Sequence, residues 1–214
     1  TWRENQYPGA ACDVQSHMYS LSFAPKTDWS KRYAEADEIF EYIQDITQQY
    51  RLKDYCKFNH EVTHAEFDEN RNVWSLDFKD QPSIEAQFVI FASGPLHVPQ
   101  IPHLKGIEKF KGKVFHSSQW DHQYSLEGKS VASIGTGGSA IQYIPEIAQE
   151  VKQLYVFQRT AAWVIPRDER KYSQLSKSLF KASNIYRQIH RTRLYWSNES
   201  RVVPIVQPQI MKYG

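Results

Sequence analysis

One stretch limits the fold more than any other: the apolar run KSVASI, from Lys129 to Ile134, leads directly into the glycine-rich GTGGSA. Gly135, Gly137 and Ala140 fit the pattern G-x-G-x-x-A, which gives a tight turn, close approach of the backbone to a pyrophosphate, and close helix-strand packing. The segment IQYIPEIAQEV predicts a helix interrupted early by Pro145, and QLYVFQ predicts a second strand. We therefore expect a βαβ unit with parallel strands, and an α/β fold.

The turn also predicts which ligand binds there. A helix N-terminus offers free backbone amides and partial positive charge to phosphates, so the predicted phosphate-binding residues are Gly135, Thr136, Gly137, Gly138, Ser139 and Ala140. The second strand runs into Arg159 and Thr160, with no Asp or Glu to bind the ribose hydroxyls of NAD. An arginine at this place favours the 2′-phosphate of NADP. The alternative is a glycine turn in an unrelated α/β protein, with Arg159 merely on the surface.

Composition argues against several other classes of function. The 26 basic and 24 acidic residues leave a net charge of +2, which disfavours a nucleic-acid binder that works through a broad basic surface. No apolar run approaches the length of a membrane-spanning helix, so we expect no integral membrane segment. Cys12 and Cys56 provide no disulfide framework and favour a reducing, cytoplasmic location. Four histidines between residues 97 and 122 lack the spacing of a zinc-binding helix, so no metal is expected.

Other patterns predict elements on both sides of the βαβ unit. One helical face is formed by Ala36, Ile39, Ile43, Ile46 and Tyr50. The alternating runs EVTHAEF and NVWSLDF predict a hairpin. We also expect a strand or an extended segment at 16–23, and a strand buried on both faces at 86–94. Residues 167–193 predict a basic helix with a solvated face, and a membrane or nucleic-acid surface is the alternative.

A second motif identifies the class of protein that the chain resembles. FKGKVFHSSQWD matches F-x-G-x-x-x-H-x-x-x-W-(P/D), the fingerprint of Baeyer–Villiger monooxygenases, at Phe110, Gly112, His116, Trp120 and Asp121. Three further segments resemble parts of class B flavoprotein monooxygenases: TWRENQYPGAACDVQSHMYS, FASGPLHVPQIP and VFQRTAAWVIPR. The resemblance follows the family's order over residues 1 to 170. Trp120 followed by Asp121 favours the Baeyer–Villiger branch over the related N-hydroxylating enzymes.

The resemblance implies an α/β flavoprotein with two dinucleotide-binding, Rossmann-like domains. Residues 1–94 would be the remainder of an FAD-binding domain, 95–109 a linker, and 110–214 an NADP-binding domain with the start of a helical region. The family's first G-x-G-x-x-G loop and its catalytic arginine match nothing in this chain. We therefore expect a piece of a longer enzyme that is incomplete at both ends.

The resemblance also implies an activity and roles for single residues. NADPH would reduce FAD, and the reduced flavin would react with O2 to a C4a-peroxide that inserts one oxygen atom into a ketone or a related apolar substrate. Trp2 and Tyr19 would contact FAD, and Val62 would meet its adenine through the backbone. Asp13 would lie near flavin and nicotinamide as the catalytic residue, where a carboxylate can orient a neighbouring cation. The fingerprint would lie at the domain junction, where His116 could form a hydrogen bond across it.

Several alternatives stay open at this point. Asp13 is also compatible with a turn or a helix cap, Val62 with an ordinary core strand, and Phe110 and Trp120 with plain core aromatics. The chain could belong to a flavin monooxygenase that oxidises nitrogen, sulfur or alkane-derived substrates. It could also be an NADP-binding module without catalytic activity.

Overall fold

The computed structural model describes residues 1–94, 98–161, 164, 167–200, 202 and 206. The chain forms two compact units: Thr1–Gln44 together with Ile101–Gly214, and Asp45–Gln100. Within the described ranges, no helix is both long and apolar enough to cross a membrane. These units are defined by packing alone, so the assignment of 1–94, 95–109 and 110–214 to two cofactor domains and a linker stays a prediction.

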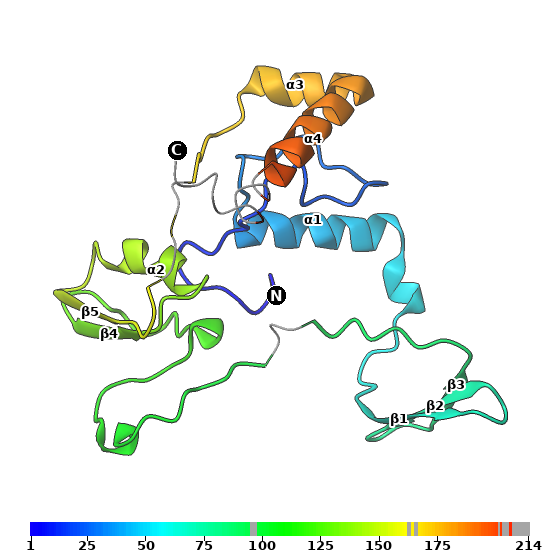
Figure 1. Ribbon diagram of the computed structural model, residues 1–214, viewed down its shortest axis with the longest axis horizontal. Helices are drawn as coiled ribbons and strands as arrows, with labels where there is room; N and C mark the ends of the chain where they lie inside the picture. The colour runs from blue at the N-terminus through cyan, green and yellow to red at the C-terminus, as the bar shows by residue number, and fades with distance from the viewer. Residues whose placement is uncertain (95–97, 162–163, 165–166, 201, 203–205, 207–214) are drawn as a thin grey trace. The chain divides into compact units, whose positions relative to one another are not determined.

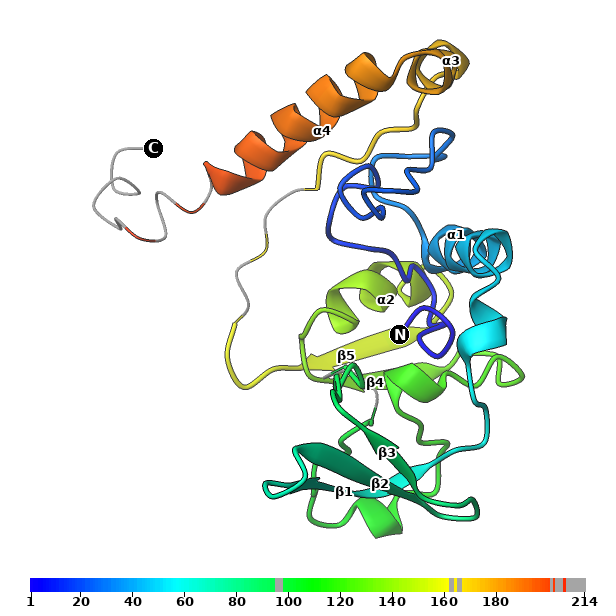
Figure 2. The same cartoon turned by 90° about the vertical axis from the view of Figure 1, so that its right-hand side faces the viewer.

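The βαβ unit predicted from the glycine turn is present in the first unit. Strand β4 (Ser130–Ile134) is followed by helix α2 (Ala140–Ile147) and strand β5 (Gln153–Phe157). The two strands pair in parallel, with Ile134 opposite Phe157, and α2 covers one face of the pair (Figures 1 and 2). Ala140 and Ile147 are the buried residues of α2, and Tyr143 of the same helix is hydrogen-bonded to Ser133 of β4, oxygen to oxygen 2.8 Å. The prediction of a parallel unit is confirmed.

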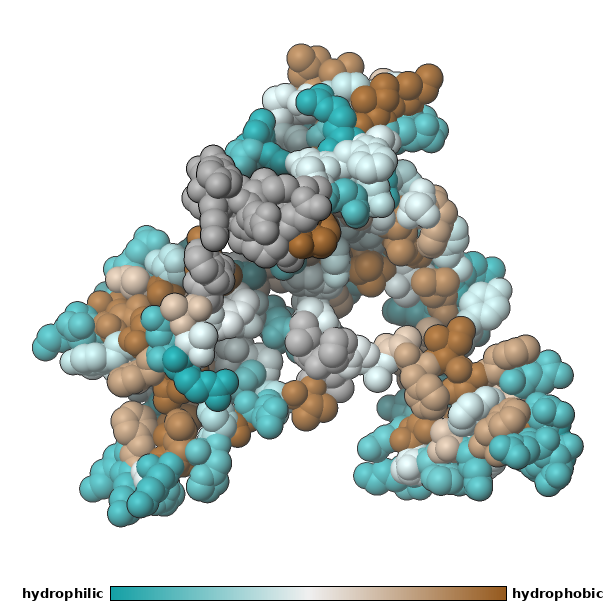
Figure 3. Space-filling model, in the orientation of Figure 1, coloured by the Kyte–Doolittle hydropathy of each residue, from teal (hydrophilic) through white to brown (hydrophobic). Residues whose placement is uncertain are grey.

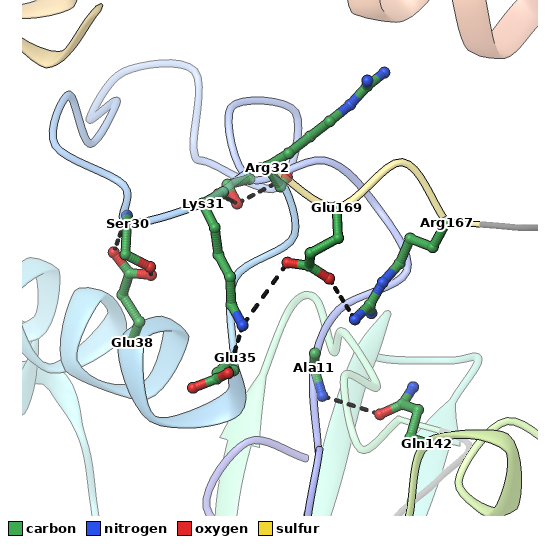
Figure 4. Close-up of polar contacts among 10 residues, drawn as sticks. Ala11, Ser30, Lys31, Arg32, Glu35, Glu38, Gln142, Arg167 and Glu169 are labelled. Carbon is green, nitrogen blue, oxygen red and sulfur yellow. Dashed lines mark hydrogen bonds and ion pairs between the residues drawn. The ribbon is translucent and has the colours of Figure 1, made fainter. Parts of the chain in front are cut away.

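The N-terminal segment packs against α2 in the same unit. The backbone amide of Ala11 donates to the side-chain oxygen of Gln142 at 2.9 Å (Figure 4). Gly9 has a φ of +74°, and a Cβ at this position would lie 2.9 Å from the backbone oxygen of Gln142. Glycine is therefore required twice here, once for the left-handed backbone and once for the close approach to the helix.

Helix α1 (Ala36–Gln49) confirms the predicted helix, and Ala36, Ile39 and Ile46 of its predicted apolar face are buried. Ile43 and Tyr50 are exposed instead, and Tyr42 takes their place in the core, where its ring contacts Trp29. The predicted strand or extended segment over 16–23 is wrong, because these residues form turns and bends. The side chain of Ser16 donates to the carbonyls of Lys31 and Arg32, and the amide of Met18 donates to the carbonyl of Gln15. Local polar side chains thus take the backbone out of the extended conformation that alternation suggested.

The basic tail forms two helices instead of the single one predicted. Helix α3 (Gln174–Ala182) ends at Ser183, whose extended backbone starts helix α4 (Asn184–Glu199). The Ser183 hydroxyl accepts from the amide of Tyr186 at 3.2 Å, as an N-cap residue does. A serine cap therefore divides what spacing alone presented as one continuous apolar stripe.

The second unit contains an antiparallel sheet with the order β1-β2-β3. Its strands are β1 (Val62–Asp68), β2 (Val73–Phe78) and β3 (Ile84–Ala86), and the 3₁₀ helix η1 (Leu52–Tyr55) precedes them in the same unit. Strands β1 and β2 pair antiparallel, so the predicted hairpin is confirmed. The predicted buried strand over 86–94 is wrong beyond Ala86. Phe88 and Ile90 are 85% and 89% exposed, and residues 87–94 pair with no strand in the described part of the chain. Apolar composition favours burial, but a strand also needs a neighbour to accept its hydrogen bonds.

Hydrophobic side chains also reach the surface around the parallel pair (Figure 3). The exposed residues there are Ile134, Tyr155, Val156 and Phe157. Since α2 covers only one face of two strands, the other face and the outer edge of β5 remain accessible.

A buried histidine lies where α3 and α4 pack on the N-terminal segment. His17 is 3% exposed, and its ring centroid lies 4.2 Å from that of Phe180, 5.0 Å from His190 and 5.1 Å from Tyr172. The ring Nε2 has no hydrogen-bond partner among the described residues. Burial, followed by the nearby His190 and Arg191, lowers the pKa of His17 to about 3.

This environment makes stability depend on pH. The folded protein binds the His17 proton less tightly than the unfolded chain, whose histidine pKa is about 6.5, so stability falls as pH drops from about 6.5 towards 3. Between pH 7 and pH 5, we expect the free energy of unfolding to fall by about 2 kcal/mol through this residue. Urea unfolding at both pH values should show the loss, and His17→Phe should remove the part that is due to His17. His190, whose pKa burial also lowers, keeps its own contribution in that variant. An unchanged pH dependence in that variant would contradict the assignment.

The contact of Gly9 with α2 predicts a large effect for a single methyl group. Gly9→Ala should lower the free energy of unfolding by about 2–4 kcal/mol, because strain at positive φ adds to overlap with the backbone of Gln142. Gly128→Ala is the matched control, since Gly128 also has a positive φ of +67° but open space around its Cβ position. That variant should lose only about 1–2 kcal/mol. Equal losses in urea unfolding would mean that the close approach does not matter.

Candidate functional site

The glycine turn lies at the carboxyl ends of the two parallel strands. Gly135 follows β4 with a φ of +102°, and its amide donates to the carbonyl of Phe157 at 2.8 Å. Gln158, Arg159 and Thr160 leave β5 next to this bond. The structure therefore brings together two segments that are separated by the whole of α2, at the edge where open α/β sheets bind ligands.

The turn has the hydrogen-bond donors that a phosphate requires. Within the described part of the chain, no hydrogen bond is found from the backbone amides of residues 136–140. Ser139 is the N-cap of α2, but its side chain does not cap the helix. A Cβ at Gly137 or Gly138 would meet nothing within 4 Å, so the space beside the turn is open. Free amides, the start of a helix and open space together fit a pyrophosphate.

Arg159 and Thr160 are exposed beside this turn. Arg159 makes no ion pair with any residue that the structure describes. Its guanidinium is therefore free to pair with an anion, which is the property that the NADP prediction requires.

The fingerprint packs close to the turn, and its tryptophan is the centre of that packing. The ring centroid of Trp120 lies 5.3 Å from Tyr143 of α2 and 5.2 Å from Phe115. Trp120 also packs against a buried cluster that contains Tyr7, Ala10 and Ala36. Trp120 thus contacts both helix α2 and the N-terminal segment.

The other fingerprint residues stabilise the conformation of this loop. A Cβ at Gly112 would lie 2.5 Å from the ring of Phe110, so that ring can lie over the backbone only because residue 112 is glycine. Nδ1 of His116 accepts from the amide of Ser118 at 3.2 Å, and this bond caps the 3₁₀ helix η3 (Ser117–Gln119). Asp121 forms an ion pair with Lys113 at 2.6 Å, and this hydrogen bond lowers the pKa of Asp121.

A cavity of about 560 Å³ lies beside the fingerprint. Its lining includes Phe110, Gly112, His116 and Trp120 together with residues of β4. The turn residues 135–140 do not line it. The glycine turn and this cavity are therefore separate features of the first unit.

Two of the residues predicted to contact FAD touch each other. Nε1 of Trp2 donates to the hydroxyl of Tyr19 at 3.0 Å, and the two rings meet edge to face at 5.6 Å. Asp13 is exposed in the same unit. Val62 belongs to the second unit, where it starts β1 opposite Phe78. The structure places all four residues, and their cofactor contacts stay predictions.

Cys12, next to Asp13, is a buried free thiol. Burial raises the pKa of the Cys12 thiol, and the Asp13 carboxylate raises it further. A protonated, buried thiol is a poor nucleophile, so Cys12 has the environment of a structural cysteine.

Sequence reasoning missed the contacts that hold the N-terminal segment in place. Gly9 and Gln142 meet across more than 130 residues of chain, and neither carries a motif of its own. Nearby, Lys31 pairs with Glu35 and, at 3.7 Å, with Glu169, which in turn pairs with Arg167 at 2.5 Å (Figure 4). Residues 31–35 precede α1 and are not helical, so the four-residue spacing of Lys31 and Glu35 carried no signal, and nothing in the sequence pointed to Glu169.

Comparison with known proteins supplies the family. Residues 5–195 match the model of the flavin-binding monooxygenase-like family. A Baeyer–Villiger monooxygenase from Pseudomonas aeruginosa is 42% identical over 213 residues, which are 99% of this chain and 40% of that protein. The chain therefore spans less than half the length of the relatives that it matches.

Two solved structures give the same relationship in three dimensions. OTEMO in complex with FAD and NADP is 32% identical with a TM-score of 0.74, over 84% of this chain and 36% of that one. A cyclohexanone monooxygenase from Rhodococcus sp. Phi1 bound to NADP+ is 33% identical with a TM-score of 0.75, over 85% and 35%. The predicted two-dinucleotide-binding flavoprotein fold is confirmed for the part that this chain covers. The βαβ unit, the fingerprint and these similarities together show that the chain belongs to the flavin-binding monooxygenase-like family.

Proposed function

We propose that this chain is part of an NADPH- and FAD-dependent Baeyer–Villiger monooxygenase, which inserts one oxygen atom of O2 into a ketone or a related apolar substrate. The observation that carries the proposal is the glycine turn at the carboxyl ends of β4 and β5, with free amides on one side and Arg159 on the other. The similarity to a protein named Baeyer–Villiger monooxygenase and to a cyclohexanone monooxygenase supports the reaction and the ketone substrate.

In this proposal, residues 135–140 bind the pyrophosphate of NADPH, with Arg159 and Thr160 on the 2′-phosphate. The free amides of the turn would donate to the phosphate oxygens, and the positive end of the α2 dipole would offset their charge. The guanidinium of Arg159 can form a bidentate pair with a phosphate, which a carboxylate at this position would repel. This arrangement would select NADPH over NADH.

The flavin side of the proposal rests on the N-terminal segment. Bound FAD would supply hydride acceptance from NADPH and activation of O2, and this chain would supply groups that hold and orient it. The hydrogen-bonded pair of Trp2 and Tyr19 offers a ready aromatic surface for this contact. Asp13, as an exposed carboxylate, can hold a cationic group beside the cofactors. Val62 would contact the adenine through its backbone.

The fingerprint has a positioning role in this proposal. Trp120 packs on Tyr143 of α2 and on the cluster around Tyr7 and Ala10. A shift of α2 would therefore displace Trp120 and, with it, the N-terminal segment. Phe110, Gly112, His116 and Asp121 hold the loop that presents Trp120. This loop lies at the start of the proposed NADP-binding domain, after the proposed linker 95–109. The proposed location of the enzyme is the cytoplasm.

Replacement of Arg159 tests the nucleotide assignment. Arg159→Ala should weaken NADP+ binding by about 1.5–3 kcal/mol, or roughly 10- to 150-fold, through loss of charge-assisted hydrogen bonds, while NAD+ binding should barely change. Isothermal titration with both nucleotides measures the two affinities. Lys152→Ala is a matched control, because Lys152 is a cation just before the opposite end of β5. Equal weakening for NADP+ and NAD+ in Arg159→Ala would refute the 2′-phosphate assignment.

A further inference from the structure

The contact between Gln142 and Ala11 joins two parts of the proposed site. Gln142 lies in the first turn of α2, next to the turn assigned to the pyrophosphate. Its side-chain oxygen accepts from the amide of Ala11 at 2.9 Å and from the hydroxyl of Tyr7 at 3.4 Å. Ala11 is only two residues from Asp13. The Gln142 side chain therefore connects α2 to the backbone segment that carries Asp13, the predicted catalytic residue.

The backbone around Ala11 leaves this amide no other acceptor. Ala11 forms an antiparallel bridge with Glu35, and the flanking bonds run from Cys12 to the carbonyl of Ala34 at 3.0 Å and from Ala36 to the carbonyl of Ala10 at 2.9 Å. In an extended segment, successive amides point to opposite sides. The amide of Ala11 therefore points away from residues 34–36 and towards α2, where Gln142 accepts it. Ala11 is 5% exposed, so without Gln142 this donor would be buried and unpaired.

We propose that Gln142 is a positioning residue: through its side chain, helix α2 fixes the backbone of residues 9–13 and thereby the position of Asp13. The inference rests on the proposed function, because it assumes that a dinucleotide occupies residues 135–140. Phosphates bound to the start of α2 would restrain its first turn, and Gln142 would pass this restraint to Ala11. Gly9 makes the connection possible, since a larger residue there would collide with the backbone of Gln142.

Hydrogen exchange of the peptide spanning residues 7–13 tests the contact without any ligand. In Gln142→Met, which keeps the length of the side chain but has no strong acceptor, the Ala11 amide should exchange roughly 5- to 10-fold faster. Gln142→Glu should restore the protection, since a carboxylate also accepts this hydrogen bond. Gln149→Met is the control at the exposed end of the same helical segment, where the glutamine side chain donates to the carbonyl of Pro145 and to no other residue that the structure describes, and it should change nothing in residues 7–13. Equal exchange in wild type and Gln142→Met would overturn the inference.

Addition of NADP+ then separates this inference from the proposed function. In the wild type, NADP+ should slow exchange both in residues 135–140 and in residues 7–13. In Gln142→Met, it should protect only residues 135–140. Protection of 135–140 without any effect on 7–13 in the wild type would overturn the role of Gln142 and leave the nucleotide site intact. No protection of either segment in the wild type would overturn the nucleotide site, and the inference with it.

Discussion

The parallel pairing of β4 with β5 is the constraint on which the candidate site depends. Parallel strands need a crossover, here α2, and their common direction brings both carboxyl ends to one edge. The turn at Gly135 and the segment at Arg159 meet at that edge for this reason alone. Without the pairing, the N-terminus of α2 and Arg159 would lie apart, and they could not form one proposed binding site.

The second dependence is the attachment of the N-terminal segment to α2. This segment has little regular secondary structure, so its position is set by contacts: the bond from Ala11 to Gln142, the close approach of Gly9, and the packing of Trp120. Each contact is worth only a few kcal/mol. Together they hold Asp13, Trp2 and Tyr19 in the same compact unit as the glycine turn, as the proposed function needs.

The buried His17 and the aromatic rings around it attach helices α3 and α4 to the N-terminal segment. His17 is neutral and enclosed by Phe180, Tyr172 and His190, while Arg191 donates to the carbonyls of His17 and Ser20. Gln15 and Asn198 exchange two hydrogen bonds across this contact. The helices α3 and α4 are thus attached through buried polar groups, which are costly when unpaired and give this contact its sensitivity to pH.

The sequence by itself determined the elements whose signals are local. The glycine turn, the strands and helix around it, α1 and the hairpin of β1 and β2 all follow from periodicity and turn residues within short windows, and the fingerprint pointed to the family. Tertiary structure decided what local signals cannot carry. Residues 87–94 are apolar, yet they form no strand because pairing depends on a neighbour, and Ser183 divides one apparent helix because a cap competes with periodicity. The contact of Gly9 and Gln142 joins residues more than 130 positions apart, and only the folded chain brings such residues together.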